Sequence, residues 1–168
     1  MSLSMYQASV PVFIRMLGNL RRLLEKGAAY ADIRKFDATA LPDSRLFADM
    51  FPLSRQVQIA TDNAKGCAAR LAGIEPPKFE DSERTIPELI DRLDKTLAFL
   101  QTLQPSQIDG SEERPITLQL RSGTLNFNGQ SYLLHFALPN FYFHVTTAYN
   151  LLRHNGVEIG KPDFLGRD

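Results

Sequence analysis

Apolar residues that recur every three or four positions constrain the fold of this chain more than any other feature of its sequence. Such spacing gathers apolar side chains along one side of a helix, which must then pack against a partner. Three segments follow this spacing, at residues 10–24, 53–71 and 86–100. In the first segment the spacing is set by Val10, Phe13, Leu17, Leu20 and Leu24.

Glycine, proline and capping residues predict where these helices begin and end. We expect Gly27 to end the first helix and Gly73 to end the second. The sequence "TIPE" at residues 85–88 combines a hydroxyl N-cap, an early proline and a glutamate three residues later, which is a capping box that starts the third helix. Residues 28–51 show no sustained period, so we expect a long connection there with at most one short helix.

The apolar period changes from that of a helix to that of a strand after the third helix. Residues 116–127 alternate apolar and polar side chains on either side of Ser122-Gly123, which predicts a β-hairpin with one apolar face. Helical spacing then resumes and ends at Asn155-Gly156. Pro139 lies inside this last segment, and we expect it to kink or divide the helix because proline lacks the amide hydrogen.

Four amphipathic helices with a small β-hairpin between the third and the fourth predict an all-α fold, a four-helix bundle decorated at one end. The 168 residues fit a single domain over residues 1–168. A chain of this size buries about 70% of the surface that its unfolded form exposes, which is enough for a substantial core.

The balance of charges argues against a polyanionic partner. Lys and Arg total 19 and Asp and Glu total 19, so no net field attracts the molecule to nucleic acid or to an anionic membrane. No segment has the apolar length of a membrane span, and the N-terminus lacks the pattern of a signal peptide. The single cysteine, Cys67, cannot form an intramolecular disulfide and is expected in the core, which favours a cytoplasmic location.

The stretch "FHVTTAYNLLRHNG", residues 143–156, contains two of the three histidines, which raises the question of a metal site. On a helix, His144 and His154 would lie roughly 15 Å apart and point about 80° away from each other, so they cannot bind one ion. His135 and His144 would lie on opposite faces of a straight helix. We expect His154 to cap the end of its helix, while His135 fits either a surface or a seam position.

His144 is the histidine with the most interesting position. It lies at the flank of the apolar side of its helix, and Asn140, four residues earlier, shares its face. The pattern allows a polar ligand site inside the bundle. It also allows a histidine that is merely satisfied by hydrogen bonds where two helices meet, which is the commoner situation.

The second helix could supply polar groups that face His144. Gln56 and Asn63 border its apolar stripe and are expected to point inward. Gln58, Asp62 and Lys65 are expected on the far side, where Asp62 and Lys65 would form an ordinary exposed ion pair.

Two stretches, "DMFPLSRQVQIATDNAKG" and "HVTTAYNLLRHNGVEIGKPDFLG", give the chain a family resemblance. It resembles the DinB/YfiT-like superfamily of metalloenzymes, and more closely a bacterial family of unknown function within that group. The resemblance implies a helical bundle and often a homodimer. Members with a metal use one histidine of the second helix and two of the last, and the matching positions here are Gln56, Asn140 and His144.

Two hypotheses follow from these residues. In the first, the protein is a dimeric, DinB-like bundle without a cofactor, whose cavity near Gln56, Asn140 and His144 binds a small ligand or has a structural role. The aromatic run Phe141–Phe143 makes its helix apolar on more than one side. Packing in the bundle core alone explains this by default, and contact with a second subunit is the alternative. In the second, it is a divergent transferase or hydrolase that binds zinc or nickel through His144, with amide oxygens of Asn140 and Gln56. Such a donor set suits zinc poorly.

Overall fold

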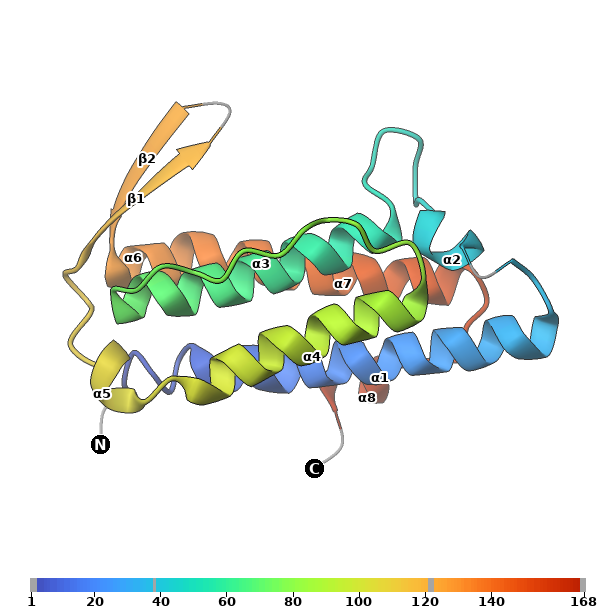
Figure 1. Cartoon of the computed structure of the whole chain (residues 1–168), viewed down its shortest axis with the longest axis horizontal. Coiled ribbons are helices and arrows are strands. Elements are labelled where there is room, and N and C mark those ends of the chain that lie inside the picture. Colours follow the sequence, from blue (N-terminus) through green and yellow to red (C-terminus); the bar gives the residue numbers. More distant parts are fainter. Residues whose placement is uncertain (1–2, 38, 121–122, 167–168) are drawn as a thin grey trace.

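The computed structural model describes residues 3–37, 39–120 and 123–166, and most of these residues are helical. Four long helices pack around one apolar core: α1 (Val10–Arg34), α3 (Leu53–Ala72), α4 (Ile86–Thr102) and α7 (Leu138–His154). Helix α3 packs against α7 and α4, and α1 packs against α4 and α7 (Figure 1). The rings of Phe13 and Phe141 meet edge to face, with centroids 4.9 Å apart, where α1 contacts α7.

Shorter elements connect and extend these helices. They are α2 (Ala40–Asp43), α5 (Pro105–Ile108), β1 (Pro115–Leu120), β2 (Gly123–Asn128), α6 (Gly129–Tyr132), a π-helical turn (Leu133–Ala137) and α8 (Lys161–Leu165). The single short helix expected within residues 28–51 is therefore α2. The chain segment that follows α2 projects from the same side of the molecule as the hairpin, at the opposite end (Figure 1).

The predicted hairpin is present. Strands β1 and β2 are antiparallel, with Pro115 opposite Asn128 and Leu120 opposite Gly123. Ser122, half of the predicted turn, lies outside the described residues. Ile116 and Leu118 are buried, but Leu120 and Leu125 are exposed, so the apolar face joins the core only at the base of the hairpin.

Helix α1 is longer than predicted, because Gly27 does not end it. The helix continues to Arg34, and Lys35 caps it in the left-handed conformation. Gly27 is buried, and a Cβ atom there would lie 3.0 Å from Cδ2 of Leu152. The glycine thus allows α1 to approach α7 closely, and the prediction mistook a packing glycine for a stop signal.

The capping predictions for α3 and α4 are confirmed. The side chain of Thr85 accepts a hydrogen bond from the amide of Glu88, and the Glu88 carboxylate accepts one from the amide of Thr85 at 2.9 Å. Helix α3 ends at Gly73, whose φ of 70° is a conformation that other residues rarely adopt.

Pro139 interrupts the last helix less than predicted. The amide of Leu138 bonds to the carbonyl of Leu133, five residues back, which widens the turn just before Pro139. The wider turn accommodates a proline that can make no amide hydrogen bond and would crowd the preceding turn of a regular helix. The chain therefore runs from α6 into α7 without a break.

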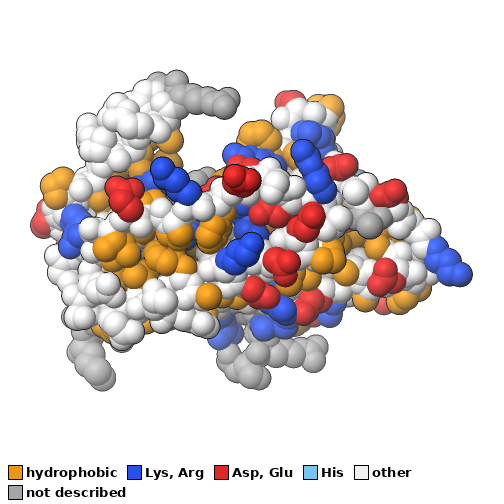
Figure 2. Space-filling view, viewed as in Figure 1, with side chains coloured by type: hydrophobic (Ala, Val, Ile, Leu, Met, Phe, Trp, Pro, Cys, Tyr) orange, Lys and Arg blue, Asp and Glu red, His pale blue; other side chains and the backbone are white. Residues whose placement is uncertain are grey.

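Side chains of both charges mix on the surface. Figure 2 shows Lys and Arg interspersed with Asp and Glu over the viewed face, so charges of one sign do not gather there. Within the described residues, none of the helices combines the length and apolar character that crossing a bilayer requires.

Candidate functional site

Gln56 of α3 and His144 of α7 form a buried polar pair between two packed helices. Their side chains are 1% and 8% exposed, and Nδ1 of His144 lies 2.7 Å from Oε1 of Gln56. Nε2 of Gln56 donates a hydrogen bond to the carbonyl of Phe51 at 3.0 Å. Because this bond orients the amide with its oxygen towards the ring, Nδ1 must carry the hydrogen and donate it.

The imidazole of His144 is neutral at physiological pH. Burial, helped by the nearby positive charge of Arg55, lowers the pKa of His144 from 6.5 to about 4. With its hydrogen on Nδ1, the neutral ring leaves Nε2 as an unprotonated acceptor. The pair is thus a hydrogen bond that joins α3 and α7, and it leaves Nε2 of His144 as a weakly basic acceptor.

The other two histidines lie apart from this pair. His135, which the sequence left between surface and seam, is exposed in the π-helical turn. His154 is exposed in the last turn of α7, but the side chain that caps this end is that of Asn155, whose Nδ2 donates to the carbonyl of Leu151 at 2.7 Å. His154 thus lies in the last turn of α7, as predicted, but the side-chain hydrogen bond to the Leu151 carbonyl comes from Asn155.

The donors near His144 do not fit a metal ion. Within residues 3–37, 39–120 and 123–166, no three His, Cys, Asp or Glu side chains form a group that could hold one. Gln56 uses both atoms of its amide within the protein, and Asn140 adds only a neutral amide. One imidazole and amide oxygens are a poor set for zinc or nickel.

A pocket of about 250 Å³ opens one helical turn from His144, between α3, the hairpin and the start of α7. Polar side chains line much of it: Arg55, Asp62, Asn63, Arg70, Tyr132 and Asn140. The structure thus pairs two of the three predicted site residues, Gln56 and His144, and gives the third, Asn140, a place in the neighbouring pocket.

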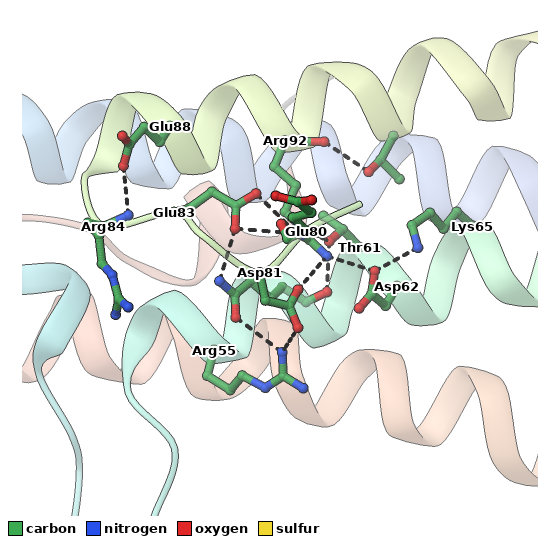
Figure 3. Close-up of polar contacts among 12 residues, drawn as sticks. Arg55, Thr61, Asp62, Lys65, Glu80, Asp81, Glu83, Arg84, Glu88 and Arg92 are labelled. Atoms are coloured by element: carbon green, nitrogen blue, oxygen red, sulfur yellow. Dashed lines mark hydrogen bonds and ion pairs between the residues drawn. The ribbon is translucent and has the colours of Figure 1, made fainter. Parts of the chain in front are cut away.

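Arg92 of α4 is the largest polar group in the interior, with 1% of its side chain exposed. Its Nε donates to Oγ1 of Thr61 at 2.7 Å, and Nη2 contacts carboxylate oxygens of Asp62 at 2.7 Å and Asp81 at 3.0 Å. Nη1 donates to the carbonyl of Glu80 and to the carboxylate of Glu83, each at 3.0 Å (Figure 3). The guanidinium thus donates hydrogen bonds to Thr61, Asp62, Glu80 and Glu83 and forms a further ion pair with Asp81.

This network corrects the prediction for the far side of α3. Gln58 and Lys65 are buried there, because the segment between α3 and α4 covers them. Lys65 does pair with Asp62 at 2.7 Å, but its side chain is only 8% exposed and its ammonium lies 4.9 Å from the ring centre of Phe79. The predicted pair is therefore present, but only Asp62, with 37% of its side chain exposed, is at the surface, while Lys65 lies inside the network.

The chain is similar to a known protein family over nearly its whole length. Residues 5–165 match the model of a family described as a domain of unknown function, DUF1993. The chain belongs to the DUF1993 family. The crystal structure of a DinB family member from Shewanella denitrificans is similar, with 41% sequence identity and a TM-score of 0.88 over 97% of this chain and 92% of that one. No curated protein matches the chain significantly.

Sequence reasoning missed the arginines of this DUF1993 domain. Arg92 lies three residues after Leu89 and directly before Leu93, both buried, so the helical period placed it beside the apolar stripe. The acidic residues at 80–83 were the second signal, since a buried guanidinium needs acceptors. Cys67 is fully buried as expected, and burial raises the pKa of its thiol well above the ordinary value, which makes it a core residue and a poor nucleophile.

Proposed function

We propose that this DUF1993 protein is a four-helix bundle of the DinB/YfiT type, a single domain over residues 1–168 that binds a small molecule and no catalytic metal. The packing of α1, α3, α4 and α7 supports the bundle, as does the likeness to the Shewanella denitrificans protein. We also propose that the protein forms a homodimer and is located in the cytoplasm. The exposed aromatic rings of α7 support the dimer, and the free, buried thiol of Cys67 supports a reducing compartment.

The hydrogen bond between Gln56 and His144 is the observation that carries the proposal. At the positions where metal-binding relatives are expected to have ligands, this chain has a neutral imidazole bonded to an amide that is itself fixed by the carbonyl of Phe51. Such a pair holds two helices together and needs no cation. The polar pocket beside Asn140 then offers a place for a small organic molecule.

Two measurements on untagged protein test this proposal. Elemental analysis after purification without added metal is expected to find no metal at stoichiometric amounts, in the wild type or in His144→Ala. Stoichiometric zinc or nickel that His144→Ala loses would favour the metal-dependent transferase or hydrolase instead.

For the ligand, small molecules of acidic, neutral and basic character are titrated while NMR follows the amide resonances around Asn140.

At least one class of molecule should shift these resonances, and Asn140→Leu should weaken its binding. Asn150→Leu, at an exposed position of the same helix, is the matched control and should leave binding unchanged. If no molecule of any class shifts the resonances, the ligand-binding role fails.

A further inference from the structure

Arg70 contributes a positive charge to the pocket that the protein leaves without an acidic partner. Its Nη1 donates a hydrogen bond to the hydroxyl oxygen of Tyr132 at 3.2 Å, and among the described residues no carboxylate forms a salt bridge with it. Arg55 and Arg92, in contrast, are both paired with Asp81. A guanidinium that is held in place but not neutralised is suited to bind an anion.

The local sequence makes room for this guanidinium. A Cβ atom at Gly66, one helical turn before Arg70, would lie 2.6 Å from Nη1 of Arg70. The missing side chain lets the guanidinium lie against α3 and reach Tyr132. Burial raises the pKa of Tyr132 to about 12, so its hydroxyl stays protonated. The hydroxyl can donate a hydrogen bond to a ligand while its oxygen accepts one from Arg70.

The one acidic residue of the pocket lining does not cancel the charge of Arg70. Asp62 is already paired with Lys65 and with Arg92, each at 2.7 Å. Its negative charge is therefore matched by two cations before any ligand enters. The unbalanced charge of the pocket belongs to Arg70, and the field there favours an anionic ligand.

The rest of the lining indicates the size and character of the ligand. Ile59, Leu118 and Phe136 give the pocket apolar walls, and Asn63 and Asn140 add amides. Oδ1 of Asn63 is buried without a hydrogen-bond partner within the described part of the chain, so this amide is not committed to the protein. The volume of about 250 Å³ is below the roughly 300–1,000 Å³ typical of drug-sized ligands, which favours a small molecule.

We propose that the pocket binds a small organic carboxylate with an apolar body, whose carboxylate pairs with Arg70 and the hydroxyl of Tyr132 while its body lies against Ile59, Leu118 and Phe136. A carboxylate fits because its two oxygens match the planar fork of a guanidinium. This inference rests on the proposed ligand-binding function and specifies the class of ligand.

Three probes of equal length and different charge test the inference: hexanoate, hexanamide and hexylammonium. Each is titrated into the full chain, with calorimetry for affinity and NMR for the resonances around Asn140. Hexanoate is expected to bind more tightly than the other two. Arg70→Gln should weaken hexanoate at least about tenfold, the loss expected for one charged hydrogen bond, and leave hexanamide almost unaffected.

Two further variants separate the role of Arg70 from effects on folding. Arg84→Gln removes an exposed positive charge outside the pocket and should leave hexanoate binding unchanged. Gly66→Ala keeps every charge and suits a helix, but its methyl group displaces the guanidinium, so it should also weaken hexanoate.

The outcomes distinguish this inference from the proposed function. If hexanamide or hexylammonium shifts the Asn140 resonances as strongly as hexanoate, or if Arg70→Gln and Arg84→Gln behave alike, the carboxylate assignment is wrong while ligand binding stands. If all three probes and the wider set of molecules leave the resonances unmoved, both proposals fall.

Discussion

His144 links the protonation of one buried side chain to the stability of the fold. Its pKa is about 4 in the folded protein, against an ordinary value of 6.5. Between these two pH values the unfolded chain binds more protons than the folded one. The contribution of His144 to the free energy of unfolding is therefore fully present above pH 6.5 and is lost as the pH falls to 4. The total contribution is roughly 2–3 kcal/mol at a site that retains slight exposure to water.

We therefore predict that His144→Gln flattens the pH dependence of unfolding. Urea denaturation at several pH values between 6.5 and 4 should show wild-type stability falling by roughly 2–3 kcal/mol more than that of the variant. His154→Gln removes an exposed histidine and should follow the wild type. Parallel curves for wild type and His144→Gln would show that the ring titrates normally in the folded state.

Among individual residues, the sequence predicted some members of the site and missed others. Gln56 and His144 could be selected because their positions relative to the apolar stripes placed them at a seam, and the structure brings them into contact. Arg70 could not, because its role depends on Tyr132, which is 62 positions away and reaches it only through the fold. Helical spacing indicates which side of a helix a residue occupies, but not what covers that side.

Among the elements, α1 contains two glycines with opposite structural roles. A Cβ atom at Gly18 would have nothing within 4 Å, whereas one at Gly27 would lie 3.0 Å from Leu152 of α7. We predict that Gly18→Ala stabilises the fold by about 0.5–1 kcal/mol, because alanine loses less backbone entropy in a helix. Gly27→Val should destabilise it by about 1–3 kcal/mol through overpacking.

Thermal and urea unfolding of the two variants measure this difference. Equal and small effects of both substitutions would mean that α1 and α7 do not approach each other closely at Gly27. The comparison also explains an error at the scale of elements. Small residues end helices and also let helices pack closely, so the sequence alone could place the capping box of α4 but not the end of α1.

For the whole molecule, the exposed aromatic side chains predict self-association. Phe51 and Phe143 are 54% and 56% exposed. The centroid of the Phe143 ring lies 5.2 Å from that of His144, and the carbonyl of Phe51 accepts the hydrogen bond from Gln56. Each ring therefore exposes apolar surface on a residue that adjoins the buried pair. Burying such a surface between two copies would supply the apolar centre of an interface of about 800 Å² per partner.

We predict a dimer in solution whose dissociation constant rises at least about tenfold in Phe143→Ser, since one aromatic side chain at an interface centre contributes a kilocalorie or more. Sedimentation velocity over a range of concentrations measures this. Leu125→Ser changes an exposed apolar residue of the hairpin and should leave the dimer intact. A wild-type protein that sediments as a monomer throughout the range would exclude the dimer.

The segment of residues 73–85 between α3 and α4 forms a strap across α3, and the guanidinium of Arg92 holds this strap in place. Salt screens exposed charges from each other beyond about 10 Å at 0.1 M. The guanidinium itself is 1% exposed, so salt acts on this network mainly through Asp62 and Asp81, whose side chains are 37% and 38% exposed. Warming lowers the cost of keeping charges away from water, so this attachment loses less with temperature than an apolar contact of similar size. Because one side chain joins Thr61 and Asp62 of α3 to residues 80–83, lifting the strap from α3 would break several contacts of Arg92 together.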